Sequence, residues 1–243
     1  MMRRGEAAEP ARDTIRGGCI TILYERKALN REDVRAFAEL AERGLGAMER
    51  LAGCKNRGGL CFELGRSGAI SSTRGRTIYL PAGRIAARTA PYLHEIVHVL
   101  LPCRRAPAWF SEGVACYFEC LVSERGEGYD SHLFTANGNA GVDTEAARWL
   151  TDARGHAVLP YVGTRGTPRR ILEDRQGVAA PFYVLSHSLV KYLAEGTSVP
   201  AVAQIARSRE FAKAVRSQSG KKMAEWREQW LATVRAERDT RTG

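Results

Sequence analysis

The feature that most constrains this chain is the segment 94–98 (HEIVH), an H-E-x-x-H pattern. It lies in an apolar stretch, residues 90–101, with Pro91 suited to a first helical turn and Pro102 closing it, so we expect a helix. In a helix, residues four apart lie on the same face, one turn above each other, so both imidazoles can bind one metal ion. Burying two histidines without such a partner would be costly, which favours a metal site.

A catalytic zinc ion takes three protein ligands and keeps one position open. A second apolar helix is expected at residues 107–121, with an N-cap near Ser111. Glu112 lies fourteen residues after His98, near the start of this helix, where the helix dipole favours a carboxylate. We therefore predict that His94, His98 and Glu112 bind one Zn²⁺ per chain and that Glu95 acts as the general base.

The composition narrows the class of protein further. The chain has 243 residues, of which 44% are hydrophobic, and this excludes wholesale disorder. The net charge is +10, but the basic residues are spread along the chain, which favours a generally basic surface over a nucleic-acid partner. No stretch approaches the roughly 18 apolar residues of a membrane span. Residues 1–18 lack the apolar region of a signal peptide, so we expect a cytoplasmic protein with six reduced cysteines.

The apolar pattern predicts an α+β fold. Strands are expected at residues 19–24, 60–64 and 76–80, with a turn at 71–75 before the last of them. Further helices are expected at 34–51, 144–153, 181–193, 200–215 and 221–238, and a loop at 123–142. We divide the chain into a flexible tail (1–17), a single domain (18–238, with an α/β part 18–104 and a mainly helical part 105–238) and a C-terminal tail (239–243).

A family resemblance rests on two specific segments. Residues 109–119 (WFSEGVACYFE) resemble the W-x-x-E-G-x-A-x-Y-x-E pattern of the peptidase MA-like and aminopeptidase N-like families. Together with HEIVH, this makes the chain similar to the gluzincins, zinc metallopeptidases of the thermolysin-like zincin superfamily. Residues 182–193 (FYVLSHSLVKYL) are similar to the family's Y-x-x-S-x-S-x-V-x-Y-L segment, so the resemblance extends over most of residues 18–238.

The resemblance implies a zincin-like fold, with a small N-terminal mixed β-sheet and helices, an active-site helix that carries the H-E-x-x-H motif, and a C-terminal helical subdomain. It implies hydrolysis of a peptide or protein, with Glu112 as the third zinc ligand and the strand at 76–80 bordering the cleft. Related families use a tyrosine as the extra oxyanion donor, which makes Tyr183 the first candidate here. His187, four residues later on the same helix face, is the second.

An alternative is a zinc-binding scaffold or sensor of the same fold that does not cut peptides. The presence of Glu95 argues for the peptidase, because a structural site needs only the metal ligands.

Glu119 lies seven residues after Glu112 on the same helix face and is a candidate to orient a histidine ligand. Cys116 stands where some zinc peptidases carry a supporting aspartate. The chain contains no G-x-M-E-N motif, which anchors the substrate amine in aminopeptidases, and this favours an endopeptidase.

Overall fold

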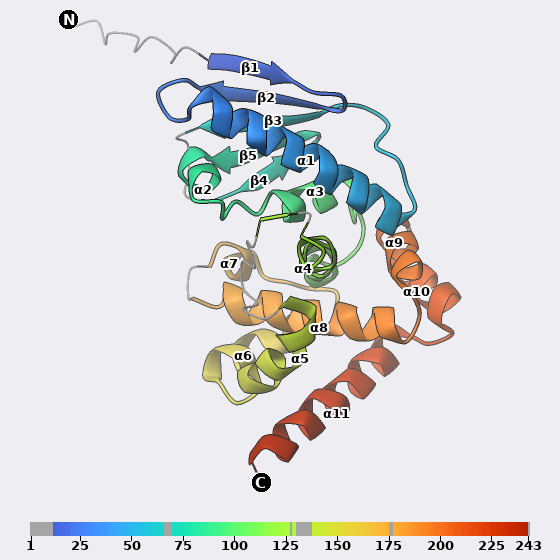
Figure 1. The fold of residues 1–243 in the computed structure, drawn as a ribbon. Coiled ribbons are helices and arrows are strands. Elements are labelled where there is room, and N and C mark those ends of the chain that lie inside the picture. Colours follow the sequence, from blue (N-terminus) through green and yellow to red (C-terminus); the bar gives the residue numbers. More distant parts are fainter. Residues whose placement is uncertain (1–11, 66–69, 127, 130–137, 175–176, 243) are drawn as a thin grey trace, which may run out of the picture.

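The described part of the chain has an α+β fold with one small mixed sheet, as predicted (Figure 1). The computed structural model describes residues 12–65, 70–126, 128–129, 138–174 and 177–242. The sheet order is β1-β2-β3-β5-β4, with β2, β3 and β5 parallel and the edge strands β1 and β4 antiparallel to their neighbours. The strands are β1 Arg12–Arg16, β2 Ile20–Glu25, β3 Leu60–Gly65, β4 Ser72–Arg74 and β5 Thr77–Pro81.

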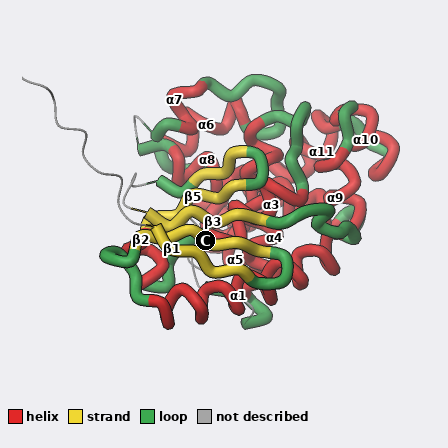
Figure 2. Tube along the Cα trace, turned by 90° about the horizontal axis from the view of Figure 1, so that it is seen from above, coloured by secondary structure: helices red, strands yellow, loops and turns green. Residues whose placement is uncertain are grey.

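Helices cover one face of this sheet and build the remainder of the molecule, as seen from above the sheet in Figure 2. None of the described helices combines the length and apolar character needed to cross a membrane. The helices are α1 Arg31–Ala52, α2 Ala82–Ala86, α3 Tyr92–Leu100, α4 Ala108–Ser123, α5 Gly138–Trp149, α6 Ala153–Val158, the 3-10 helix η1 Leu159–Tyr161, α7 Arg169–Leu172, α8 Ala179–Glu195, α9 Val199–Arg207, α10 Phe211–Ser219 and α11 Met223–Thr242.

The core between the sheet and α1 follows from alternation along the strands. Ile22, Phe62 and Ile78 are register partners on three adjacent strands, and all three are fully buried. Phe37 of α1 meets Phe62 edge to face at 5.3 Å between ring centroids, and meets Tyr92 of α3 at 5.4 Å. Such pairs stabilise a core beyond the area they bury. They fix α3 against both α1 and the sheet.

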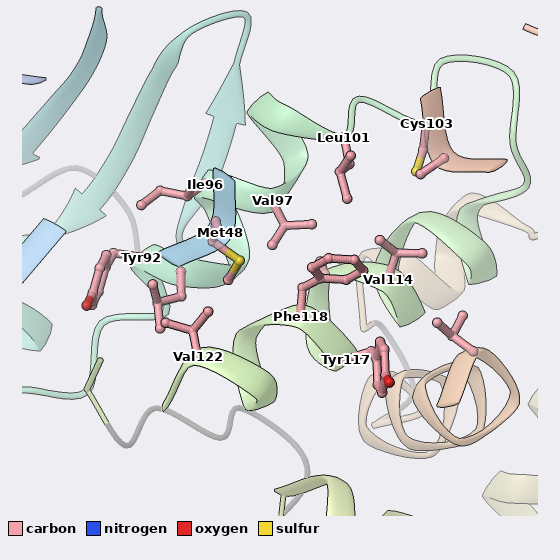
Figure 3. Close-up of a cluster of buried hydrophobic side chains, with 14 of the residues drawn as sticks. Met48, Tyr92, Ile96, Val97, Leu101, Cys103, Val114, Tyr117, Phe118 and Val122 are labelled. Atoms are coloured by element: carbon pink, nitrogen blue, oxygen red, sulfur yellow. The ribbon is translucent and has the colours of Figure 1, made fainter. Parts of the chain in front are cut away.

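One face of α3 packs into an apolar cluster shared with α4. Figure 3 shows Val97 of α3 directed toward Phe118 of α4, with Val114 beside Phe118, whereas Ile96 points away from α4. All four side chains are at most 1% exposed. This packing leaves the histidine face of α3 turned toward the cavity described below.

Two differences from the sequence prediction concern the sheet edges. Residues 12–16, predicted as part of a flexible tail, form β1, while residues 1–11 lie outside the described part. This strand is polar apart from Ile15 and is held by pairing with β2, so its apolar pattern is too weak to detect. The predicted turn at 71–75 contains β4, so the open edge belongs to β4 and the predicted strand at 76–80 lies inside the sheet as β5.

Helix boundaries also differ from the prediction. The single helix predicted at 200–215 is two helices, α9 and α10, and the helix predicted at 144–153 is replaced by α5 and α6. The predicted loop at 123–142 is shorter within the described residues, because α5 begins at Gly138. Ser111 does not cap α4, because that helix begins at Ala108 after Pro107, which places Ser111 inside the first turn. The position of Ser111 matters for the candidate site, because its hydroxyl reaches a histidine on α3.

Candidate metal centre

Three predicted ligands converge at the contact between α3 and α4. His94 Nε2 and His98 Nε2 are 3.1 Å apart, as expected for side chains on successive turns of one helix. Glu112 Oε2 lies 3.2 Å from His94 Nε2 and 3.5 Å from His98 Nε2. Within the described residues, these three form the one group of His, Cys, Asp or Glu side chains able to hold a metal ion.

The distances between the three donor atoms can be compared with those expected around a tetrahedral zinc ion. Tetrahedral zinc binds histidine nitrogen and carboxylate oxygen at about 2.0–2.2 Å, which places the ligand atoms roughly 3.3–3.5 Å from one another. The three edges of this triangle, 3.1, 3.2 and 3.5 Å, match that requirement with little movement. Two imidazoles and one carboxylate are also a ligand set found in catalytic zinc sites.

Groups behind the histidines hold the rings in place. His94 Nδ1 lies 3.6 Å from Glu119 Oε2 and 3.8 Å from Cys116 Sγ. Ser111 Oγ lies 3.4 Å from His98 Nδ1. Metal-binding histidines commonly use the second ring nitrogen in this way, which fixes both ring orientation and tautomer. Glu119 therefore occupies the place expected from its spacing, whereas the contact of Ser111 was missed because we assigned it to the helix cap.

Electrostatics favour a cation at this point. Burial alone would lower the pKa of His94, but the Cys116 thiol and the carboxylates of Glu112 and Glu119 raise that pKa well above its ordinary value. Burial opposes ionisation of Glu112, yet the charge of His98 and hydrogen bonds with both histidines hold the pKa of Glu112 below its usual range. The metal-free site thus keeps a proton on His94 where a bound dication would place its own charge.

We expect zinc affinity to weaken as the pH falls. The His94 proton must leave before its nitrogen can bind a metal, and the raised pKa means that this proton is still bound at neutral pH. One displaced proton changes the apparent affinity about tenfold per pH unit. Competition with a chelator of known proton affinity, at about pH 6, 7 and 8, measures this slope. An affinity that stays constant over this range would show that metal binding displaces no proton from His94.

Glu95 faces the same cavity but is not part of the donor triangle. It is 6% exposed, and its Oε2 accepts a hydrogen bond of 2.6 Å from Thr73 Oγ1 on β4. This contact fixes the carboxylate beside the three donor side chains and ties α3 to the edge strand. Thr73 could not be predicted from the sequence, because only the tertiary packing of β4 against α3 brings it to Glu95. The β-branched residue in the segment SSTR was the available signal for a strand.

The two candidate oxyanion donors lie in different surroundings. Tyr183 of α8 lines the cavity, its ring centroid 6.0 Å from that of His94. Burial and the nearby charge of Glu112 raise the pKa of Tyr183, so its hydroxyl keeps its proton at neutral pH. His187 is fully buried one turn later, where its Nε2 lies 2.7 Å from Asn139 Oδ1 on α5. The structure therefore brings Tyr183 to the predicted ligands and leaves His187 between helices.

The site opens into a cavity of about 690 Å³. A smaller cavity of about 270 Å³ adjoins it and shares Ser71, His94, Glu95 and Tyr183. The larger cavity is lined by Ser71, Ser72, Thr73, Gly75, Arg76, His94, Glu95, His98, Val99, Pro102, Arg104, Ser111, Glu112 and Tyr183. A substrate can therefore reach the point next to the three donor atoms and Glu95.

Solved structures of similar fold are zinc enzymes. An M1 zinc metallopeptidase from Deinococcus radiodurans superposes with a TM-score of 0.55 at 18% identity, over 91% of this chain and 51% of that chain. Its E323A mutant bound to a Tyr-Ser-Ala substrate gives 0.54 at 18% identity, over 91% and 52%. This chain shares their fold. It spans about half of their length, and no family model and no curated protein matches it.

Proposed function

We propose that this chain is a zinc-dependent metallopeptidase of the gluzincin type that hydrolyses peptide bonds. The observation that carries the proposal is the triangle formed by His94, His98 and Glu112, with zinc-compatible edges, beside an open cavity that Glu95 also faces. The fold shared with M1 zinc metallopeptidases supports it. The catalytic unit is taken as residues 18–238, extended to include β1 because that strand belongs to the sheet.

In the proposed reaction, the zinc ion and the protein side chains have different roles. Zinc held by His94, His98 and Glu112 would lower the pKa of a water molecule toward about 7 and polarise the substrate carbonyl. Glu95 takes the proton of that water and later passes it to the leaving amine. Tyr183 donates its hydroxyl proton in a hydrogen bond to the carbonyl oxygen as negative charge develops there. His187 stays outside this reaction because its ring is engaged with Asn139.

The deciding experiment combines metal analysis with a peptide-cleavage assay. We expect about one zinc per chain, loss of cleavage after chelation, and recovery when zinc is added back. Replacing His98 with Ala should abolish both zinc binding and cleavage. His156→Ala is the matched control, because His156 contacts the backbone oxygen of Leu150 and lies outside the cavity. Zinc retained without any cleavage would instead support a non-catalytic scaffold or sensor.

The role of Tyr183 has its own test. Tyr183→Phe removes the hydroxyl and keeps the ring, so zinc content and KM should change little. Removal of one oxyanion donor typically costs about 10²-fold or more in kcat, and we expect a loss of about that size. Tyr161→Phe, a partly buried tyrosine on η1 that does not line the cavity, should keep full activity. Equal kcat values for the Tyr183 variant and the wild type would remove Tyr183 from the mechanism.

A further inference from the structure

The two adjoining cavities form one cleft that runs along α3 and β4. At one end lie Pro91, before α3, and Ile70, before β4; at the other end lie Pro102 and Arg76, which follow them. The metal ligands and Glu95 lie between these ends. Nine helical residues span about 14 Å, a length that about four residues of an extended peptide cover. A peptide bound across the metal centre therefore reaches both ends.

The end near Pro102 is positively charged. Arg76 is held by Asn56 and by the backbone oxygens of Gly58 and Gly59. Arg104 is exposed, and within the described residues it makes no hydrogen bond or ion pair. Among the described residues that line the larger cavity, the acidic side chains are Glu95 and Glu112, which already contact Thr73 and the histidines. A bound dication would offset these two carboxylates, and the two arginines would leave this end net positive.

The opposite end combines exposed apolar side chains with one charged side chain of each sign, Arg84 and Asp174. Ile70 is 76% exposed and Leu172 is 41% exposed, and no other large hydrophobic side chain in the described part of the chain is as exposed. Both line the smaller cavity, together with Pro91 and Ala179. Exposed large apolar side chains that lie together at one cavity indicate a binding surface.

We propose that this cleft selects an extended peptide with an acidic side chain on the Arg104 side of the scissile bond and an apolar side chain on the side of Ile70 and Leu172. The inference rests on the proposed function and adds a substrate class to it. Arg104 supplies a planar guanidinium suited to a carboxylate, and no internal carboxylate competes for it within the described residues.

The test uses quenched peptides that pair Leu with Glu, Gln or Lys, in both orders around the scissile bond. Zinc-loaded wild-type protein should cleave the Glu peptide with a kcat/KM roughly tenfold above the Gln peptide, and the Lys peptide should be cleaved least. Arg104→Glu should reverse the order of Glu and Lys. Arg235→Glu, an exposed change of equal charge on α11, should leave the ratios unchanged. In a further pair of peptides that carry Leu or Asn at the apolar position, Leu172→Ser should weaken discrimination between the two.

Binding to the zinc-loaded Glu95→Gln protein, measured by fluorescence anisotropy with the same peptides, separates this inference from the proposed function. Charge-selective binding that Arg104→Glu reverses, without cleavage by the wild type, would support the inference and overturn the peptidase. Cleavage with equal ratios in the wild type and the Arg104 variant would overturn the inference alone. Absence of both binding and cleavage for every peptide would overturn both.

Discussion

Replacing Glu95 with Gln is expected to lower kcat/KM by about 10³-fold while leaving one zinc bound per chain. The amide keeps the size of the side chain and its contact with the Thr73 hydroxyl, but it cannot accept the proton of the attacking water. Glu95 lies outside the donor triangle, so the metal ligands stay in place. Steady-state cleavage of a peptide and zinc content of the same preparation measure the two properties together.

Glu112→Gln is the informative comparison, because it makes the same chemical change on the neighbouring helix. Glu112 Oε2 is within 3.5 Å of both histidine nitrogens, so its loss of charge should weaken zinc binding as well as cleavage. The two variants therefore separate a base from a ligand. Loss of zinc in the Glu95 variant would make Glu95 a ligand, and full activity in that variant would place the base elsewhere.

The parts of the site that sequence could predict are those set by local geometry. The spacing of His94 and His98 determines their approach once a helix forms, because four residues make about one turn. The short connection to α4 limits where Glu112 can lie, and the observed distances agree with that prediction. The strands at Ile20–Glu25 and Leu60–Gly65 could also be predicted from the sequence. In the structure, each alternates between buried and half-buried residues.

The parts that escaped prediction depend on contacts between distant segments. Thr73 reaches Glu95 only because β4 adds to the edge of the sheet next to α3. Tyr183 and His187 are one turn apart on α8, and the periodicity of the chain could not decide which of them faces the metal ligands. The packing of α4 on α8 decides between them. The two helices approach each other at Gly113 and Ser186, and Ser186 lies between the two candidates along α8.

Gly113→Ala is expected to destabilise the fold by about 2–4 kcal/mol and to weaken zinc binding with it. A Cβ at this position would lie 2.4 Å from the backbone oxygen of Ser186 and 2.8 Å from Val190 Cγ2. A backbone oxygen inside a helix cannot rotate away as a side chain can, so α4 and α8 must separate. Glu112 is the preceding residue, and its carboxylate would move away from the histidines. Gly113 therefore keeps Glu112 and Tyr183 within one site.

Thermal and urea unfolding of the metal-free protein measure the stability change without the contribution of bound zinc. For a chain of this length, the expected loss corresponds to a Tm lower by roughly 5–15 °C. Gly83→Ala is the matched control, since a Cβ there meets nothing within 4 Å and the residue lies in α2. That variant should be neutral or slightly more stable, by up to about 1 kcal/mol. If the two variants unfolded alike, close packing at Gly113 would not be what positions Glu112.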